Sequence, residues 1–475
     1  MADVSVRTRE GGTTVIASAA IDGLRGRLRG PVCLPGEPGY EQARTLWNAM
    51  IDRHPALVAR AAGAADVIQT VGFAREHGLS LAVRGGGHNI AGLAVCEGGL
   101  LLDLSTMKSV RVDPEGRTAR VEPGVTLGDF DREAQAFGLA TPLGINSTTG
   151  VGGLTLGGGF GWLSRKYGLA IDNLLSADVV SADGRLLKAS ERENPDLFWA
   201  IRGGGGNFGV VTSFEFRLHP VGPEVIAGLI VHPLSQAKSL FEGYRQIVAA
   251  ASDELTCWVV LRKAPPLPFL PPEVHGTGVM VLAVCHSGDL QSGRKAIAPL
   301  QALGKPIADV TGPTPFAAWQ TAFDPLLTPG ARNYWKSHNL LQLGDGAIDV
   351  LLDQAGRLPS PECEVFVGSL GRAVNRVPAT ATAYPHRDVE FVVNIHTRWR
   401  DPAQDPECTA WARGAFDALA PHATGGVYVN FMPEDESQRV QSGAYGPNYA
   451  RLAKLKATYD PQNLFRQNHN VQPVK

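Results

Sequence analysis

The stretch Leu81-Ala82-Val83-Arg84-Gly85-Gly86-Gly87-His88-Asn89 organises the chain, and a second apolar run, Leu101-Leu102-Asp103-Leu104, follows it. An apolar run typical of a β-strand leads directly into three glycines and then a histidine. Glycines carry no Cβ atom, so their backbone can come within hydrogen-bonding distance of a ligand. Successive N–H groups in such a turn form a concave site suited to a phosphate or pyrophosphate, with His88 beside the bound group. The same pattern also fits a glycine-rich connection with a solvated histidine, and the stretch alone leaves both interpretations open.

The composition is that of a soluble globular protein. Of 475 residues, 44% are hydrophobic and 19% are charged. This length exceeds what one hydrophobic core usually supports, so two or three domains are expected. The net charge is −2, from 44 basic and 46 acidic residues. That balance gives no electrostatic footprint for nucleic acid or an anionic membrane, so the expected partner is a small molecule.

The cysteines and the N-terminal segment indicate the cellular compartment of the protein. The six cysteines lie far apart, without a CxxC pair or zinc-ligand spacing. In a chain of this length, such spacing favours buried free thiols in a reducing compartment. Residues 1–30 lack the continuous apolar region of a signal peptide, and no run approaches the roughly 20 apolar residues that span a bilayer. A cytoplasmic protein that does not bind membranes is therefore expected.

Two further stretches are rich in glycine. Eight glycines lie between Gly150 and Gly168, a density that indicates close approach of the backbone to a ligand. The third stretch contains a formal GxGxxG made of Gly204, Gly206 and Gly209. A Rossmann fingerprint must open a helix, but the residues that follow here are β-branched and aromatic and predict a strand. The Rossmann interpretation is therefore rejected.

The remaining pattern is that of an α+β protein. Strand-like runs alternate with helical ones over residues 225–285, and a proline-rich loop at 264–272 indicates a surface or a site entrance. This pattern predicts one antiparallel sheet with helices on one side. Helices are expected at 40–53, 64–78, 128–137, 237–251, 291–302, 315–323, 406–419 and 445–458. Hairpins are expected at 110–122 and 175–189, and strands at 363–370, 389–399 and in the segment GVYVNFM, 426–432.

Taken together, the motifs resemble those of a known family. They are Arg84-Gly85-Gly86-Gly87-His88, Gly150-Val151-Gly152-Gly153, Gly157-Gly158-Gly159-Phe160-Gly161, Gly168-Leu169, Asp172-Asn173, Gly205-Gly206-Asn207-Phe208-Gly209-Val210-Val211, Tyr384-Pro385-His386-Arg387, Trp399, Tyr428-x-Asn430-Phe431 and Tyr459-Asp460-Pro461-x-Asn463-Leu464-Phe465. In this order they resemble the FAD-linked oxidases of the vanillyl-alcohol-oxidase/p-cresol-methylhydroxylase (PCMH) fold, in the berberine-bridge-enzyme-like branch. The resemblance is dense over 80–215 and after 425, and thin over 220–380.

The resemblance implies a fold and a cofactor. It implies an α+β fold with a split, PCMH-type FAD-binding domain formed by residues 1–218 and 425–475. A central antiparallel-sheet domain with helices on one side, residues 219–424, would bind the substrate. His88 occupies the position of the histidine that is bonded to the 8α-methyl carbon of FAD in such proteins. The other residues implied in cofactor binding are Arg84, Gly85, Gly86, Gly87, Asn89, Asn146, Thr149, Gly152, Gly153, Gly158, Gly159, Gly161, Val211 and Asn470.

Two positions depart from patterns found in relatives. Many relatives form a second flavin link through a cysteine, and the aligned residue here is Asn146, which cannot form that bond. A single, histidyl link is therefore expected. This departure also argues against sugar oxidation, since sugar-accepting relatives usually carry both links. Relatives place an oxygen-gating residue where Thr149 lies, and its small side chain favours entry of O2.

The strand expected at 389–399 carries the first catalytic candidates. Alternation places Val392, Asn394 and His396 on one face, and in relatives this face of the sheet looks at the flavin. Flavin oxidation also needs a base for the O–H or N–H proton of the substrate. A neutral amide is not a strong base, so Asn394 is expected to hydrogen-bond, whereas histidine accepts protons near neutrality. His396 is either that base or a structural histidine on a half-buried strand.

Tyr428 and Asn430 are the second catalytic candidates, on one face of the strand expected at 426–432. Family members use a tyrosine here as the base or as a positioning group, and Phe431 stands where many relatives have a further tyrosine. A tyrosine ordinarily titrates near pH 10, and the sequence shows no partner that would lower this value.

The expected function is that of an FAD-dependent oxidase. It would transfer a hydride from an alcohol or amine carbon of a small, aromatic or natural-product-like substrate to FAD, with O2 reduced to H2O2. One alternative is a carbohydrate or oligosaccharide oxidase of the same fold, and another is a flavoprotein without net redox turnover. Neither a metal site nor an oligomeric state is indicated by the sequence.

Overall fold

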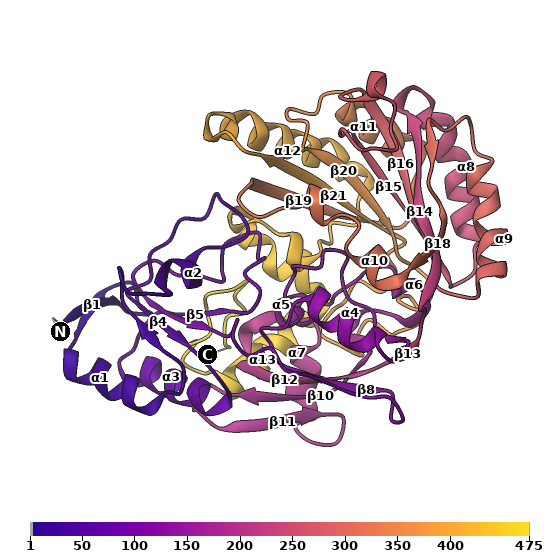
Figure 1. Cartoon of the computed structure of the whole chain (residues 1–475). Coiled ribbons are helices and arrows are strands. Elements are labelled where there is room, and N and C mark those ends of the chain that lie inside the picture. The colour runs from indigo at the N-terminus through magenta and orange to yellow at the C-terminus, as the bar shows by residue number, and fades with distance from the viewer. Residues whose placement is uncertain (1–2, 475) are drawn as a thin grey trace.

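A computed structural model describes residues 3–474 of the chain, which form three main β-sheets (Figure 1). The first has the order β3-β4-β6-β5, in which β4, β6 and β5 are parallel. The apolar residues of the opening stretch form β5 and β6, which pair residue by residue from Leu81 with Leu100 to Arg84 with Asp103. The elements of this part are β1 (Val4–Arg7), β2 (Thr13–Ile16), α1 (Ser18–Arg27), β3 (Val32–Cys33), α2 (Tyr40–Arg44), β4 (Leu57–Arg60), α3 (Ala64–Glu76), β5 (Leu81–Arg84) and β6 (Leu100–Asp103).

The second sheet is antiparallel and has the order β11-β10-β12-β8-β7. Both predicted hairpins, at 110–122 and 175–189, are confirmed in it. A strand follows the GxGxxG stretch, as predicted, so the Rossmann interpretation was rightly rejected. The elements here are β7 (Val110–Asp113), β8 (Thr118–Val121), α4 (Leu127–Gln135), β9 (Leu139–Ala140), α5 (Val151–Leu156), α6 (Ser164–Tyr167), β10 (Leu174–Val180), β11 (Leu186–Ser190), α7 (Pro195–Ile201), β12 (Val210–Arg217) and β13 (His219–Pro220).

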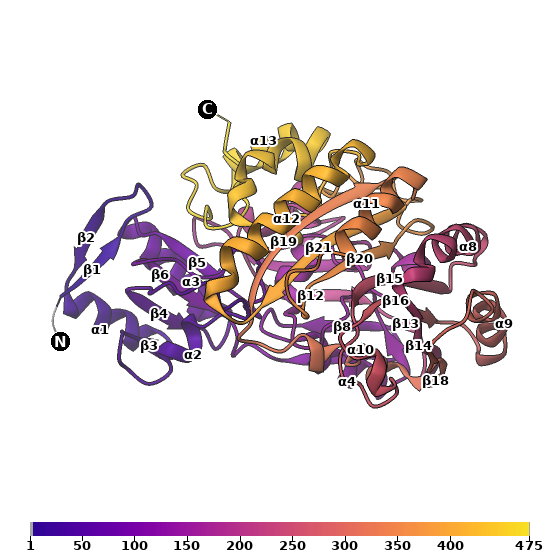
Figure 2. The same ribbon diagram turned by 90° about the horizontal axis from the view of Figure 1, so that it is seen from above.

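The third sheet confirms the predicted antiparallel sheet with helices on one side. Its order is β17-β14-β16-β15-β20-β21-β19, with β18 beside β14. Helices α8, α9, α11 and α12 cover its outer face (Figures 1 and 2). The elements are β14 (Glu224–Pro233), α8 (Ala237–Ala250), β15 (Leu255–Lys263), β16 (Gly278–His286), α9 (Leu290–Gln301), β17 (Ala308–Asp309), β18 (Gly312–Pro315), α10 (Phe316–Gln320), β19 (Arg332–Leu340), α11 (Asp345–Ala355), β20 (Glu364–Ser369), β21 (Phe391–Trp399) and α12 (Asp405–Leu419).

Alternation along the strands divides the two faces of this sheet. On β20 and β21, Val365 and Val393 pack into the core beneath the helices. Their neighbours Phe366 and Val392 belong to a different core on the opposite face. That opposite face is turned toward the rest of the molecule, so it is the face that can meet a ligand held there.

The C-terminal part of the chain returns to the first half, and α13 (Tyr449–Tyr459) packs against α7. The strand predicted at 426–432 is wrong, because residues Val429–Phe431 form a single 3₁₀ turn. The side chains of Tyr428 and Asn430 form hydrogen bonds with the glycine-rich region, and the backbone of this segment joins no sheet. The helix predicted at 40–53 ends at Arg44. Beyond it, Trp47 and Asn48 are held by long-range hydrogen bonds, Asn48 to the carbonyls of Ile90 and Asn333.

The six cysteines are buried free thiols, as predicted. Within residues 3–474, no helix is both long and apolar enough to cross a bilayer. The same part of the chain contains no cluster of three histidine, cysteine or acidic side chains arranged to hold a metal ion.

Candidate active site

A cavity of about 360 Å³ lies where the three glycine-rich stretches, the inner face of the third sheet and the C-terminal segment meet. Most of the predicted site residues line it. They are Gly85, Gly86, Gly87, His88, Asn89, Asn146, Thr149, Gly152, Gly153, Val211, Asn394, His396, Tyr428 and Asn430. Segments that are more than 300 residues apart in sequence are thus brought to one site.

The cavity-lining glycines serve two different purposes. A Cβ atom on Gly86 would lie 2.4 Å from the backbone nitrogen of Gly150, so glycine is required there for two loops to touch. A Cβ on Gly153 or Gly206 would meet nothing within 4 Å. At these two positions the backbone is open toward the cavity, as a site for a close-lying dinucleotide requires.

Three predicted cofactor-binding glycines do not line the cavity, and packing explains each of them. A Cβ on Gly161 would lie 2.1 Å from the carbonyl oxygen of Leu143, and one on Gly159 would lie 2.6 Å from the side chain of Ala170. Gly158 has a φ of +128° and faces the rings of Tyr384 and Tyr428. Protein atoms thus lie against all three, and none of them lines the cavity.

Arg84 and Asn470 also lie outside the cavity wall. The Arg84 guanidinium donates to the carbonyl of Gln42 at 2.8 Å and also to that of Ala43, which ties the start of the glycine loop to the end of α2. These hydrogen bonds hold the loop in place. The Asn470 side-chain oxygen is buried without a hydrogen-bond partner, and its neighbours Gln467, Asn468 and His469 line the cavity in its place.

His88 is held in a fixed position at the cavity wall. Its Nε2 lies 2.9 Å from the Thr148 hydroxyl and its Nδ1 lies 3.4 Å from the Thr149 hydroxyl. The imidazole stacks on Trp47 at a centroid distance of 5.0 Å. Burial, and then the positive charge of Arg84, lower the pKa of His88 to about 3. The ring is therefore neutral near pH 7, and a neutral imidazole has a lone pair that can attack an electrophilic carbon.

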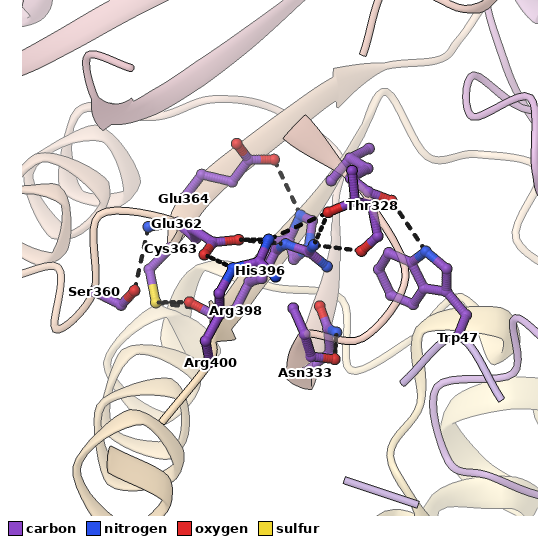
Figure 3. Close-up of polar contacts among 12 residues, drawn as sticks. Trp47, Thr328, Asn333, Ser360, Glu362, Cys363, Glu364, His396, Arg398 and Arg400 are labelled. Carbon is purple, nitrogen blue, oxygen red and sulfur yellow. Dashed lines mark hydrogen bonds and ion pairs between the residues drawn. The ribbon is translucent and has the colours of Figure 1, made fainter. Parts of the chain in front are cut away.

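The register of the third sheet places four side chains in one row across its inner face. Trp335 on β19 pairs with His396 on β21, His396 pairs with Glu364 on β20, and Glu364 pairs with Arg262 on β15. Nδ1 of His396 lies 3.0 Å from a Glu364 carboxylate oxygen (Figure 3). Arg262 contacts the other oxygen at 2.8 Å. Glu364 was not predicted from the sequence. Alternation along the expected strand at 363–370 could have suggested it, but the pairing that brings it to His396 could not be read.

The side chains of this row determine the charge of Glu364 and the position of the proton on the neutral His396 imidazole. Burial alone would raise the pKa of Glu364, but Arg262 and His396 outweigh burial and hold this pKa below its usual value. An ionised carboxylate accepts the hydrogen bond from Nδ1–H of His396. In the neutral imidazole this hydrogen bond leaves the lone pair on Nε2, which is buried without a hydrogen-bond partner among the described residues. His396 lines the cavity, so this nitrogen is the candidate proton acceptor of the row.

The adjacent row contains Asn394, which pairs with Ser337 and Phe366. Its side-chain oxygen is buried and has no hydrogen-bond partner in the described part of the chain. The alternation predicted for this strand is confirmed, since Asn394 and His396 both line the cavity while Ile395 packs against α12. The Asn394 side-chain oxygen and Nε2 of His396 both lack hydrogen-bond partners among the described residues, so they can bind the polar group of a substrate.

Tyr428 and Asn430 form a fixed pair on the opposite side of the cavity. The Tyr428 oxygen accepts the Gly159 N–H at 3.0 Å and the Asn430 side-chain N–H at 2.9 Å. Asn430 also donates to the carbonyl of Leu154 at 3.1 Å. Burial raises the pKa of Tyr428 to about 12 despite these two hydrogen bonds. Tyr428 therefore keeps its proton at neutral pH and is suited to positioning and to hydrogen-bond donation.

Comparison with known proteins agrees with this geometry. A family described as "FAD binding domain" matches residues 55–190, and one described as "Berberine and berberine like" matches residues 427–472. An FAD-linked oxidoreductase of Dictyostelium discoideum is 32% identical over 94% of this chain and 96% of its own length. A xylooligosaccharide oxidase of Thermothelomyces thermophilus is 29% identical over 96% of this chain and 95% of its own. Among solved structures, 6-hydroxy-D-nicotine oxidase of Arthrobacter nicotinovorans superimposes with a TM-score of 0.85, at 30% identity over 94% of this chain and 98% of the other.

Proposed function

Because the chain belongs to the berberine-bridge-enzyme-like FAD-linked oxidoreductases, we propose that it oxidises an alcohol or amine carbon of a small aromatic or natural-product-like substrate. The substrate gives up a hydride and a proton, and bound FAD supplies the two-electron acceptor. O2 then takes two electrons and two protons to give H2O2. One observation carries this proposal: His396, whose Nε2 has no hydrogen-bond partner among the described residues, lines the same cavity as the open glycines and His88.

Most of the residues that would hold FAD come from the first half of the chain. Gly153 and Gly206 leave the backbone open to a dinucleotide, and residues 85–89, Gly152 and Val211 complete this side of the cavity. His88 would form the single covalent link through an imidazole nitrogen, which its neutral state favours. Under this proposal, residues 1–218 and 425–475 bind the cofactor and residues 219–424 bind the substrate.

His396 would act as the general base. Glu364 accepts a hydrogen bond from Nδ1–H of His396 and so fixes the tautomer. Nε2 would then take the O–H or N–H proton of the substrate. Arg262 keeps Glu364 ionised. Asn394 would orient the same polar group of the substrate, while Tyr428 and Asn430 would hold the opposite wall. This assigns the base to the sheet and leaves Tyr428 a positioning role, since its raised pKa opposes proton abstraction.

Thr149 bears on whether O2 is the electron acceptor, and Asn146 bears on the class of substrate. Thr149 lines the cavity beside His88, and its small side chain would leave a path for O2. Asn146 accepts two hydrogen bonds from Thr148, at 3.0 Å from the backbone N–H and 2.6 Å from the hydroxyl. It thereby orders the loop where relatives that oxidise sugars usually carry a second link.

A panel of primary and secondary alcohols and amines tests the proposal. Purified protein should release H2O2 with at least one of them, and the same compound should bleach the flavin under anaerobic conditions. His396→Gln should bind that compound but bleach about 10²- to 10⁴-fold more slowly, the usual contribution of a general base. If ligands shift the flavin spectrum but none bleaches it, a flavoprotein without redox turnover is the better description.

A further inference from the structure

A second cavity, of about 70 Å³, adjoins the first on the inner face of the third sheet. The two share lining residues, so they lie side by side with part of their walls in common. The shared residues are Ile145, Trp258, Leu327, Glu364 and Phe366. Apart from Arg262 and Glu364, whose charges neutralise each other, every residue that lines the second cavity is apolar.

The register of the sheet explains why its inner face changes from polar to apolar. One cross-strand row runs from Asn394 through Phe366 and Val260 to Val281 and Val231. The polar end of this row lines the first cavity, and its last three residues line the second. Trp258, Ala283 and Leu229 form a parallel row beside it. Along these rows the inner face of the sheet therefore changes from polar groups to a hydrocarbon floor.

The other walls of the second cavity are also apolar. The proline-rich loop at 264–272 contributes Leu267, Phe269 and Leu270 to the lining. Its base is closed by two backbone hydrogen bonds of 2.8 Å, from the Ala264 N–H to the Thr277 carbonyl and from the Gly276 N–H to the Ala264 carbonyl. On the opposite side, Trp162 stacks on Trp258 at a centroid distance of 4.2 Å. The loop thus forms a wall with a fixed base over the apolar floor.

We propose that this second cavity binds an uncharged apolar tail of the substrate. The substrate is then an amphiphilic alcohol or amine, with its oxidisable end at His396 and Asn394 and an aliphatic or aromatic tail over Val260, Val281 and Ala283. This proposal rests on the proposed function and narrows its substrate class. The cavity is several times larger than one water requires, and an apolar cavity binds apolar groups instead of ordered water. The second sugar ring of an oligosaccharide would lose its hydrogen bonds to water in this cavity, so oligosaccharides are poor candidates for the substrate.

A homologous series of ligands measures this subsite. Each methylene that leaves water for an apolar cavity should tighten binding about fourfold. The probes are straight-chain alcohols from 1-butanol to 1-decanol, and dissociation constants come from the perturbation of the flavin spectrum in the holoenzyme. For wild type, the dissociation constant should fall about fourfold for each added methylene until the cavity is filled, and then level off.

Three variants connect this series to the second cavity. Ala283→Leu adds volume to the floor and should make binding level off at a shorter chain, whereas Phe269→Ala removes part of the wall and should weaken the longer alcohols selectively. Ala283 and Phe269 line only the second cavity. Pro266→Ala is the matched control, because Pro266 is exposed on the same loop and lines neither cavity. Thermal melting and flavin content should confirm that each variant is folded.

The outcomes separate this inference from the proposed function. If Ala283→Leu and wild type show the same dependence on chain length, the second cavity does not bind the tail. The same conclusion follows if affinity does not change along the series. His396→Gln should lose turnover yet keep the wild-type chain-length dependence. A protein that oxidises none of these compounds, but whose affinities follow the predicted series, retains the subsite and contradicts only the oxidase assignment.

Discussion

Replacing Glu364 with glutamine is the sharpest perturbation of the proposed catalytic row. The two carboxylate oxygens of Glu364 have different partners, Arg262 at 2.8 Å and Nδ1 of His396 at 3.0 Å. In Glu364→Gln the single amide oxygen should turn to Arg262, because the guanidinium can only donate hydrogen bonds. The amide NH2 then faces Nδ1 of His396 and donates to it. This moves the imidazole proton to Nε2, which can no longer accept a proton from the substrate.

The expected loss follows from this change of tautomer. Loss of the charge-assisted hydrogen bond alone, about 1.5–3 kcal/mol, corresponds to roughly a tenfold to hundredfold lower rate. Loss of the base as well extends the range to about 10²- to 10⁴-fold, the contribution of a general base. The double variant Glu364→Gln/His396→Gln should be no slower than His396→Gln alone, because both changes remove the same function.

The assay is anaerobic stopped-flow measurement of flavin bleaching at saturating substrate. Glu362→Gln is the matched control, since Glu362 pairs with Arg398 and Arg400 outside the cavity (Figure 3). It should bleach at close to the wild-type rate. The reasoning is refuted if folded, flavin-loaded Glu364→Gln bleaches as fast as wild type. It is also refuted if Glu362→Gln slows bleaching as much as Glu364→Gln does.

Three further predictions address other parts of the site and the fold. Tyr428→Phe should slow bleaching less than tenfold, because we propose His396 as the base, yet lower stability by about 1–3 kcal/mol by leaving two N–H donors unpaired. A loss as large as that of His396→Gln would assign the base to Tyr428. Asn146→Cys should add a second covalent link and change the flavin absorption spectrum, and an unchanged spectrum would count against the alignment of Asn146 with the cysteine of relatives. Burial raises the pKa of Asp131 to about 7 even though Gln320 donates to it. Stability from its bound proton is therefore full below about pH 4 and is lost as pH rises through 7, by roughly 4 kcal/mol at most. Between about pH 5 and about pH 8, chemical unfolding should show a loss of roughly 3 kcal/mol in wild type and a smaller one in Asp131→Asn, and equal losses would contradict it.

The parts of the fold and site that were predicted correctly depend on local pattern. Alternation along 389–399 placed Asn394 and His396 on one face of β21, and the family resemblance implied that this face looks at the flavin. Both residues line the cavity. The partners of His396 could not be found in this way. Glu364 lies 32 residues from His396, and Arg262 lies 102 residues from Glu364, so only strand register brings the three together. Register depends on the packing of the whole sheet.

Incorrect predictions arose where tertiary contacts decide the local structure. The segment 426–432 alternates like a strand, yet the Tyr428 hydroxyl bonds to Gly159 and the chain turns. Glycines posed a related problem, because their identity does not reveal what lies beside them. Gly86 is needed for contact with Gly150, Gly161 for contact with Leu143, and Gly153 for an open backbone. Only the arrangement of the loops distinguishes these roles.

The covalent state of the flavin tests the central claim most directly. Wild-type protein and His88→Ala should both be precipitated with acid, washed, and inspected for flavin colour. We predict a yellow wild-type pellet, a colourless His88→Ala pellet, and a wild-type proteolytic peptide that contains His88 and carries the mass of FAD. A colourless wild-type pellet, or flavin attached to a peptide without His88, would contradict the account.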